Sequence, residues 1–228
     1  MMHEAATMKI GTDAMLLGAW TRIPENGKVL DIGTGSGILA LMVAQRSKNL
    51  IIEAIDIDKP SVDQALFNFE SSRWRERLQA KVSHIQSFCL LEQVEKYQLI
   101  LSNPPYFTSN FKSSLERKNL ARHTDSLNHR QLIEAAARLL HQQGLFSVII
   151  PYDSGDSFVA VASESGLFLQ RKLVIVPVEG KSANRVILEL GFGNKNKPEF
   201  QQLTIRKSDS SFTPAYNNLL KDFYLGIE

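Results

Sequence analysis

The sequence predicts an α/β fold with a doubly wound, mostly parallel sheet of seven strands that ends in a C-terminal antiparallel hairpin. Three observations lead to this fold class. Short apolar runs alternate with segments of helical period along most of the chain, which is typical of βαβ units. The first apolar run leads directly into a glycine-rich turn. Near the C-terminus, two apolar runs follow each other without room for a helix between them.

The first part of the chain supplies five expected strands and three expected helices. The runs with the length and apolar content of strands lie at 28–32, 51–57, 80–83, 97–102 and 145–151. The segments with apolar residues at helical spacing lie between them, at 38–46, 60–73 and 129–142. Pro60 suits the first turn of its helix, and Gly144 is expected to end the third helix.

The C-terminal part is expected to complete the sheet. A helix at about 155–165 precedes KLVIVPV (172–178) and RVILELGF (185–192), which we interpret as the antiparallel hairpin. No repeat or long linker interrupts the chain, so a single domain is expected. Its parts would be an N-terminal helix and cofactor-covering segment (1–27), the half that carries cofactor and target base (28–151) and a C-terminal half (152–228).

Composition excludes several classes of protein. The 228 residues are 43% hydrophobic and 22% charged, which is ordinary for a soluble globular protein. No stretch approaches the roughly 20 apolar residues that span a bilayer, and the start lacks the pattern of a signal peptide, so we expect a cytoplasmic protein without membrane contact. The net charge of +2 permits a polyanionic partner without requiring one. Five scattered histidines and the single Cys89 give no metal-ligand spacing, so no metal is expected.

A glycine-rich turn follows the first expected strand. The stretch VLDIGTGSGI contains Gly33, Gly35 and Gly37, which let the backbone approach a ligand closely. A dinucleotide fold is the obvious alternative, but its G-x-G-x-x-G spacing requires the third glycine one residue later, and Asp31 would repel a pyrophosphate. The carboxylate suits a cation, so S-adenosylmethionine, with an ammonium, a sulfonium and no phosphate, fits better. Asp56, which ends the second strand, is placed to accept both ribose hydroxyls.

The stretch LILSNPPYF ends another expected strand with two prolines. Each proline restricts the residue before it to an extended conformation, so the side chain of Asn103 is held in one direction. Its oxygen and the carbonyl of Pro104 can accept the two N–H groups of a planar amine, such as the exocyclic amine of adenine, and direct the nitrogen lone pair toward an electrophile. Tyr106 offers a face for stacking on a planar target. The alternative is that the prolines only end the strand and Tyr106 only packs.

Together, VLDIGTGSG, AIDID and SNPPY resemble the motifs of class I S-adenosylmethionine-dependent methyltransferases that modify planar amino nitrogens, which have a Rossmann-like fold. The stretches MKIGTDAMLLGAW (8–20), ARHTDSLNHRQLI (121–133) and FTPAYNNLLKDFYL (212–225) resemble the tRNA(Val) adenine N6-methyltransferase family, which methylates the adenine 3′ to the anticodon, at position 37. The resemblance spans almost the whole chain. It implies S-adenosyl-L-methionine as cofactor and tRNA as partner.

The resemblance also implies roles for individual residues. The residues that would hold or cover the cofactor are Lys9, Gly11, Thr12, Asp13, Asp31, Gly33, Gly35 and Asp56. Those that would meet the target adenine are Asn103, Pro104, Pro105, Tyr106 and Phe107, of which Asn103, Pro104 and Tyr106 form the expected catalytic group. A second interpretation of Thr12 or Asp13 is the N-cap of a helix over AMLLGAW.

The chain departs from the family pattern at two places. Where related enzymes present an acidic residue toward the adenine amine of the cofactor, this sequence has His84, whose neutral imidazole can accept one hydrogen bond. Relatives also begin with a basic, aromatic segment, whereas this chain starts seven residues before the MK-x-GTD stretch. We therefore expect any RNA contact that this segment supplies to be missing, or the true start to lie earlier.

The segment 108–130, which follows the SNPPY turn, is a candidate RNA-binding loop. Its cations outnumber Glu116 and Asp125, and a cationic arm beside the target pocket is where a phosphate backbone would run. The cations expected to bind RNA are Lys112, Arg117, Lys118 and Arg122, with Arg130 at the end of the segment. The alternative is a solvated loop without a partner.

Two other functions stay open at the level of sequence. A protein glutamine N5-methyltransferase would use the same NPPY turn on a carboxamide nitrogen, but such enzymes usually carry an N-terminal helical domain for which we expect no room before residue 28. A non-catalytic subunit that binds cofactor or RNA would not need Asn103. A monomer is the expected oligomeric state.

Overall fold

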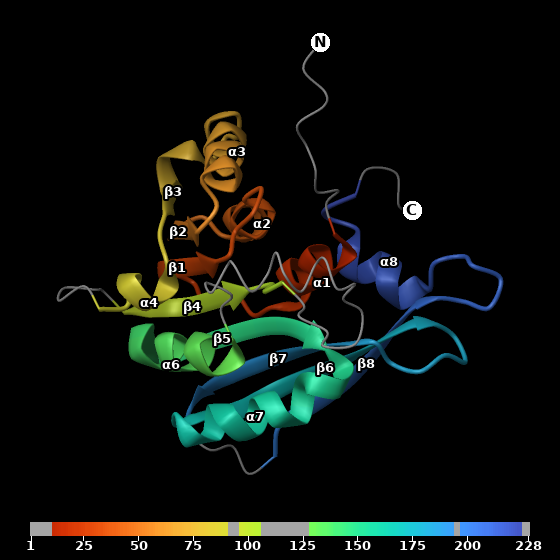
Figure 1. The fold of residues 1–228 in the computed structure, drawn as a ribbon. Helices are drawn as coiled ribbons and strands as arrows, with labels where there is room; N and C mark the ends of the chain where they lie inside the picture. The colour runs from red at the N-terminus through yellow and green to blue at the C-terminus, as the bar shows by residue number, and fades with distance from the viewer. Residues whose placement is uncertain (1–10, 91–95, 106–127, 194–196, 225–228) are drawn as a thin grey trace, which may run out of the picture.

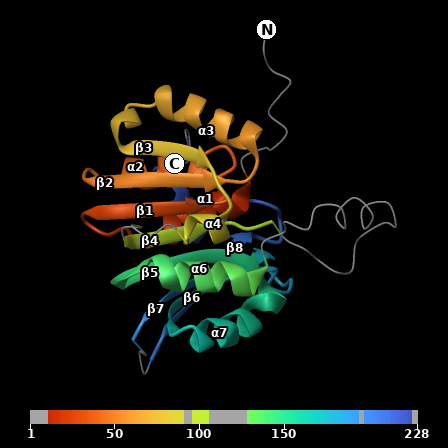
Figure 2. The same cartoon turned by 60° about the vertical axis from the view of Figure 1, so that its left-hand side comes forward.

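The computed structural model describes residues 11–90, 96–105, 128–193 and 197–224. Its centre is one sheet with the strand order β3-β2-β1-β4-β5-β7-β6-β8 (Figures 1 and 2). Strand β7 runs antiparallel to β5 and β6, and the other neighbouring pairs are parallel. The strands are β1 (Gly27–Ile32), β2 (Leu50–Asp56), β3 (Leu78–Val82), β4 (Tyr97–Ser102), β5 (Leu140–Pro151), β6 (Leu167–Val178), β7 (Arg185–Phe192) and β8 (Glu199–Arg206).

Helices cover both faces of the sheet. The helices α1, α2, α3 and α8 bury their apolar side chains in one hydrophobic cluster, and α4, α6 and α7 bury theirs in a second cluster on the opposite face (Figures 1 and 2). None of the described helices is long and apolar enough to cross a membrane. The helices are α1 (Thr12–Trp20), α2 (Ile38–Arg46), α3 (Lys59–Glu70), α4 (Ile85–Phe88), α6 (His129–Leu139), α7 (Gly155–Glu164) and α8 (Pro214–Leu220), with 3₁₀ turns η1 (Arg75–Arg77) and η2 (Tyr152–Ser154).

Three helices begin where the sequence supplies a side-chain cap. The Asp58 carboxylate accepts a hydrogen bond from the backbone N–H of Ser61 at the start of α3, whose first turn contains a proline. A capping box between Asn128 and Gln131 opens α6. Thr213 caps α8 in the same way as Asp58 caps α3. These caps satisfy backbone donors that the first turn of a helix leaves without partners.

Helix α1 is buried along most of its length. Its residues 14–20 are all buried, and the helix packs against α2, α8 and β5. A helix that is apolar on every side belongs inside a protein, which explains why this short segment forms a stable helix. It therefore connects the half of the sheet that contains β1 with the half that contains β7 (Figure 1).

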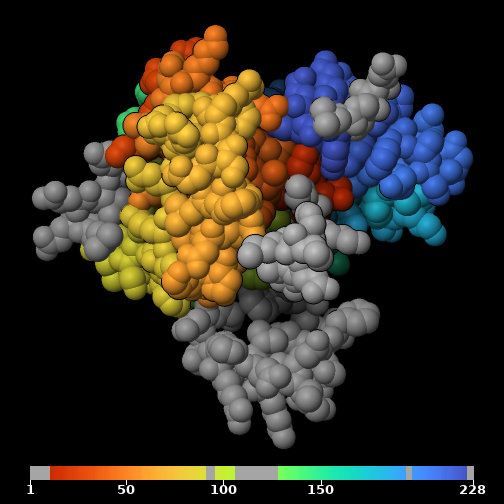
Figure 3. Space-filling model, turned by 90° about the horizontal axis from the view of Figure 1, so that it is seen from above, coloured from red at the N-terminus to blue at the C-terminus, as the bar shows by residue number. Residues whose placement is uncertain are grey.

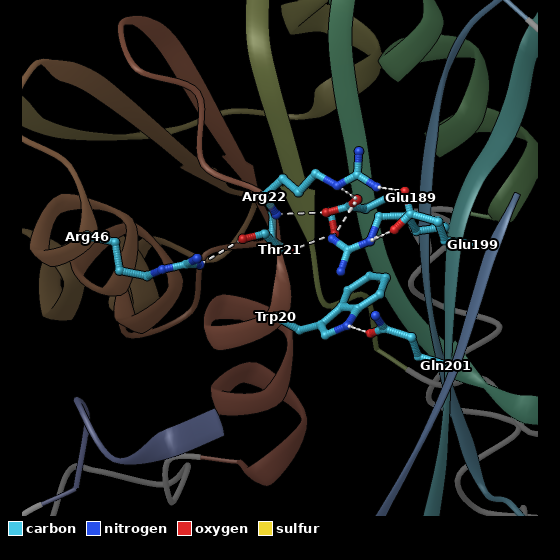
Figure 4. Close-up of polar contacts among 9 residues, drawn as sticks. Trp20, Thr21, Arg22, Arg46, Glu189, Glu199 and Gln201 are labelled. Carbon is cyan, nitrogen blue, oxygen red and sulfur yellow. Dashed lines mark hydrogen bonds and ion pairs between the residues drawn. The ribbon is translucent and has the colours of Figure 1, made fainter. Parts of the chain in front are cut away.

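A polar network fixes the C-terminal end of α1 (Figure 4). The carboxylate of Glu189, on β7, is fully buried and accepts hydrogen bonds from the Arg22 backbone N–H at 2.7 Å and from the Arg171 guanidinium at 3.2 Å. The exposed Glu199 pairs with both arginines, at 2.9 and 3.2 Å. Trp20 donates from its indole nitrogen to the side-chain oxygen of Gln201 at 2.8 Å. Together these contacts tie α1 to β6, β7 and β8.

The predicted fold class is confirmed, with one strand more than expected. The described residues form eight strands because 199–206 adds the edge strand β8. The expected helix over 38–46 and strand over 97–102 match α2 and β4 residue for residue, and the C-terminal hairpin is antiparallel as predicted. The weak strand expected at 80–83 is β3, which begins at Leu78.

Two expectations about helix ends are wrong. Helix α6 ends at Leu139, so Gly144 does not terminate it but lies inside β5. A Cβ atom at Gly144 would lie 2.8 Å from the Tyr97 carbonyl oxygen, next to the register shift between β4 and β5, so close strand approach explains the glycine. At α1, neither Thr12 nor Asp13 is the N-cap, because Thr12 is the first helical residue and Gly11 occupies the cap position without a side-chain bond.

Candidate active site

The site is positioned by the pairing of β1 with β4. The order in which strands are added to the sheet reverses between β1 and β4. From β1 the chain adds β2 and then β3 on one side, and it then returns to add β4 on the other side of β1. Ligands of doubly wound sheets bind at such a switch point, beyond the carboxyl ends of the strands. Ile32 pairs with Ser102, so Gly33 and Asn103 leave the sheet side by side.

The turn after β1 has the conformation that only glycine adopts readily. Gly33, Gly35 and Gly37 have φ angles of 71°, 55° and 81°. The backbone N–H groups of Gly33 and Thr34 donate to the Ile55 carbonyl oxygen at 2.9 and 3.1 Å, so the turn bends over the end of β2. At Gly33, which is exposed and where a Cβ atom would meet nothing within 4 Å, the turn therefore offers bare backbone to a ligand at this edge of the sheet.

Asp31 carries a carboxylate that is fully buried beneath this turn. The Thr34 hydroxyl donates to its Oδ2 atom at 2.6 Å, whereas Oδ1 has no hydrogen-bond partner among the described residues. Burial raises the pKa of Asp31 to about 7. The hydroxyl group of Thr34 and the backbone N–H of Ala40 favour the ionised carboxylate and lower the pKa, but by less than burial raises it. An ammonium group fits this oxygen, because it would supply both the missing donor and a compensating positive charge.

Asp56, the last residue of β2, shapes the turn with both carboxylate oxygens. Its Oδ2 accepts the backbone N–H of Gly35 at 2.9 Å, and its Oδ1 accepts that of Asp58 at 3.0 Å. Each carboxylate oxygen can accept a second hydrogen bond, so a half-buried Asp56 keeps one acceptor site per oxygen for a pair of hydroxyl groups. Its position beside the glycine-rich turn agrees with the expected ribose contact.

The end of β4 is fixed to β1. The buried Ser102 hydroxyl donates to the Ile32 carbonyl oxygen at 3.0 Å, immediately before the NPP stretch. Asn103 is half-buried, Pro104 is buried and Pro105 is exposed. The Asn103 amide thus follows the strand next to β1, which carries Asp31 one residue before its end. The oxygen atoms of Asn103 and Pro104, which can accept hydrogen bonds from an amine, therefore lie at the same edge of the sheet as the Asp31 carboxylate, which suits a cation.

Comparison with known proteins agrees with this arrangement. The family model described as methyltransferase small domain matches residues 4–156. A tRNA1(Val) (adenine(37)-N6)-methyltransferase from Phocaeicola vulgatus is 41% identical over 225 residues, which cover 99% of this chain and 94% of that protein. One of the same name from Trichodesmium erythraeum is also 41% identical and covers 98% and 93%. The chain belongs to the tRNA1(Val) (adenine(37)-N6)-methyltransferase family.

Solved structures with low sequence identity share the fold of this methyltransferase. A predicted O-methyltransferase from Agrobacterium tumefaciens has a TM-score of 0.68 at 18% identity, over 92% of this chain and 95% of that chain. A putative class I S-adenosylmethionine-dependent methyltransferase from Listeria monocytogenes has a TM-score of 0.59 at 15% identity, over 92% and 67%. These structures support the Rossmann-like fold class.

Two other predicted contact regions of the methyltransferase lie at the same edge of the sheet. The exposed His84 follows β3 and occupies the N-cap position of α4, next to Ser83, whose backbone N–H donates to the Asp56 carbonyl oxygen at 2.9 Å. Gly11 and Thr12 are exposed at the start of α1, and Asp13 pairs with Arg185 at 2.9 Å. Contacts of these residues with a cofactor stay predictions.

The remaining predicted site residues lie outside the described residues. They are Lys9, Tyr106, Phe107, Lys112, Arg117, Lys118 and Arg122. Arg130, at the end of the expected RNA-binding segment, is described and pairs with Glu164 at 2.9 Å.

Sequence reasoning missed two supporting residues of the site. Thr34 donates to Asp31, and Ser102 joins the ends of β4 and β1. A hydroxyl residue three positions after a buried aspartate, inside a turn, is a signal that could have identified Thr34. Ser102 gave no such signal, because its partner lies on a neighbouring strand. In the part of the chain that the structure describes, no three histidine, cysteine, aspartate or glutamate side chains are grouped to hold a metal ion.

Proposed function

We propose that this protein transfers a methyl group from S-adenosylmethionine to the exocyclic N6 of an adenine in tRNA, namely adenine 37, next to the anticodon of valine tRNA. The observation that carries the proposal is the juxtaposition of Asn103 and Pro104 with the glycine-rich turn, fixed by the pairing of Ile32 with Ser102. The names of relatives at about 40% identity over nearly the whole chain support the substrate.

The residues at the end of β4 would orient the nucleophile. An adenine amine is a weak nucleophile because its lone pair is delocalised into the ring. The side-chain oxygen of Asn103 and the carbonyl oxygen of Pro104 would accept its two N–H groups and turn the lone pair out of the ring plane. Asn103 is neutral, so it positions the amine rather than deprotonating it, and the proton leaves after methyl transfer.

The residues at the ends of β1 and β2 would hold the cofactor. S-adenosylmethionine supplies an electrophilic methyl group when it is bound. Asp31 would accept the ammonium group at its Oδ1 atom, which has no hydrogen-bond partner among the described residues. Asp56 would accept the ribose hydroxyls with the acceptor sites that Gly35 and Asp58 leave. The exposed backbone of Gly33 would let the methionine part approach closely. A tRNA substrate also agrees with the expected cytoplasmic location, which stays a prediction, as does a monomeric state.

The test is methyl transfer from labelled S-adenosylmethionine to unmodified bulk tRNA, with a protein extract in parallel, followed by nucleoside analysis. We expect label in N6-methyladenosine of tRNA. The Asn103→Ala variant should lose turnover by about two orders of magnitude or more while it still binds the cofactor, because positioning of the reacting groups is what it removes.

Other outcomes would contradict the proposal in different ways. Label in the protein extract and not in tRNA would indicate a glutamine N5-methyltransferase. Cofactor binding without label in either would indicate a non-catalytic subunit. Equal loss of cofactor binding in Asn103→Ala and Asp56→Ala would contradict the assignment of separate roles to β4 and β2.

A further inference from the structure

A concave surface lies at the same edge of the sheet as the candidate active site. It is a groove of about 600 Å³ between the start of α1, the ends of β6 and β8 and the helix α8. The strand pairing places the groove at this edge. Arg185, which lines the groove, pairs with Pro151 at the carboxyl end of β5, and Val178 pairs with Arg206 at the carboxyl ends of β6 and β8. In Figure 3 the red atoms of α1 lie beside the blue atoms of the C-terminal segment. We name this surface the α1–α8 groove.

The α1–α8 groove contains aromatic rings that are held in place. Phe212 and Tyr216 stack with their ring centroids 4.7 Å apart and their planes at 12°. Burial, followed by a hydrogen bond with Tyr224, raises the pKa of Tyr216 to about 12, so its hydroxyl stays neutral and linked to Tyr224. Tyr224 itself is 38% exposed. The buried Tyr216 ring therefore supports two exposed rings that line the groove, Phe212 by stacking and Tyr224 through its hydroxyl group.

The groove also contains a cation that is fixed without a carboxylate. The Arg206 guanidinium lies 4.0 Å from the centroid of the Phe212 ring and donates to the Ser210 carbonyl oxygen at 2.6 Å. No ion pair to an acidic side chain within the described residues involves Arg206. The Arg206 guanidinium is thus held by the Phe212 ring and one hydrogen bond, while its remaining N–H groups and its positive charge can still bind an anionic ligand. Arg185, by contrast, is already paired with Asp13.

We infer that the α1–α8 groove binds single-stranded RNA nucleotides that flank the target adenine, with a base stacked on Tyr224 and a phosphate bound by Arg206. The inference rests on the proposed function, because an adenine that is turned out of an RNA loop leaves its neighbours unstacked. Exposed aromatic rings with an adjacent cation are the features by which proteins bind such nucleotides. The groove lies at the same edge of the sheet as Asn103, which would hold the adenine.

The charges around the groove predict which interaction dominates. Lys181 and Lys207 are exposed near Arg206, but Glu179 and Asp209 are exposed there too. This mixture of signs cannot attract a phosphate backbone strongly over a long distance. We therefore expect stacking to contribute most of the affinity of the groove and Arg206 to account for one phosphate contact.

The test uses fluorescence anisotropy to measure how tightly the full chain binds a fluorescent RNA stem-loop that carries the target adenine in its loop. A second RNA lacks the bases of the nucleotides next to that adenine but keeps their phosphates. Wild-type protein should bind this abasic RNA about tenfold more weakly than the intact one. Tyr224→Ala should bind the intact RNA about tenfold more weakly than wild type and should no longer distinguish the two RNAs. Tyr224→Phe, which keeps the ring, should behave as wild type.

Arg206→Gln gives an independent readout. The slope of log Kd against log salt concentration should decrease by about 0.7 in this variant, as expected for one lost phosphate contact in a single strand. Tyr224→Ala should leave the slope unchanged. The matched controls are Phe200→Ala, a 67% exposed ring at the other end of β8, and Arg75→Gln, a 60% exposed arginine on η1. Both should bind the RNA as wild type does, and every variant should bind S-adenosylmethionine normally, which shows that it is folded.

The inference is overturned if Tyr224→Ala binds the intact RNA as wild type does, or if it still discriminates against the abasic RNA. An unchanged salt dependence in Arg206→Gln would overturn the phosphate contact. Methyl transfer to the same RNA by wild-type protein is measured in parallel. Its absence would contradict the proposed function, whereas the anisotropy data alone decide whether the groove binds RNA.

Discussion

At the scale of single residues, Asp31 has the most unusual environment at the site. Its carboxylate is fully buried with one oxygen unpartnered among the described residues, and its pKa is raised from 3.8 to about 7. The folded protein therefore binds a proton more tightly than the unfolded chain, so the stability of the free protein should fall as pH rises from 4 to 7. Binding of a cationic ligand would explain why the protein keeps a buried carboxylate that destabilises its free form, because the ligand would compensate the buried negative charge.

The affinity for S-adenosylmethionine should consequently depend on pH. An ammonium group binds the ionised carboxylate, and with a pKa of about 7 only about a tenth of Asp31 is ionised at pH 6. We expect the affinity to rise about fivefold between pH 6 and pH 7, where half of Asp31 is ionised and the amino group of the cofactor is still mostly protonated, with a proton released on binding. Calorimetry in buffers of different ionisation enthalpy measures both quantities.

Two variants serve as controls for this pH dependence. Asp31→Asn should bind weakly at every pH and lose the dependence, and it should stabilise the free protein at pH 8 because no charge is buried. Thr34→Val removes the hydrogen bond that favours the ionised form and should move the midpoint to higher pH. An affinity that stays constant between pH 6 and 7.5 in wild type would show that Asp31 does not bind the cationic group.

At the scale of elements, α1 joins the two halves of the sheet. The network around Glu189 fixes its C-terminal end, and the pair of Asp13 with Arg185 fixes its N-terminal end beside the site. Arg46 adds hydrogen bonds to the carbonyl oxygens of Gly18 and Thr21, and burial lowers the pKa of its guanidinium. The position of α1 relative to the site thus depends on charged contacts as well as on apolar packing.

Substitution of Glu189 should destabilise the protein far more than substitution of Glu199. Glu189→Gln leaves Arg171 beside a neutral group in a buried site, and we expect the free energy of unfolding to fall by about 3 kcal/mol. The side chain of Glu199 is 54% exposed, so Glu199→Gln should cost less than about 1 kcal/mol although it contacts the same arginines. Urea denaturation at neutral pH measures both. Similar losses in the two variants would contradict a special role for the buried carboxylate.

Elements with strong local signals were predicted from sequence, and elements defined by distant contacts were not. Helix α2 and strand β4 were found to the residue because a glycine-rich turn precedes one and two prolines follow the other. Strand β8 was missed because EFQQLTIR lies at the sheet edge, where its first four side chains are exposed and the strand lacks a regular apolar pattern. The helix over 129–142 was predicted too long, because the residues LLHQ (139–142) continue its helical pattern of apolar residues. In the structure Leu140 instead pairs with Tyr97 of β4, so the strand β5 begins there.

At the scale of the whole molecule, one edge of the sheet gathers residues that are far apart in sequence. Asp31 and Asp56 lie at the carboxyl ends of β1 and β2, and Asn103 follows β4. That they come together was predicted, since a doubly wound sheet brings the carboxyl ends of its parallel strands together. The α1–α8 groove was not predicted, because it combines residues between 12 and 224 that only the folded chain brings together. This edge is therefore where the proposed cofactor, target base and neighbouring nucleotides would bind.

The measurement that tests the central claim most directly is methyl transfer to two unmodified transcripts of valine tRNA that differ only at position 37. One transcript has adenine at this position and the other has guanine, and both are incubated with wild-type protein and labelled S-adenosylmethionine. We predict that the adenine transcript accepts about one methyl group per molecule, recovered as N6-methyladenosine, and that the guanine transcript accepts none. Equal labelling of the two transcripts, or labelling of neither, would contradict the account.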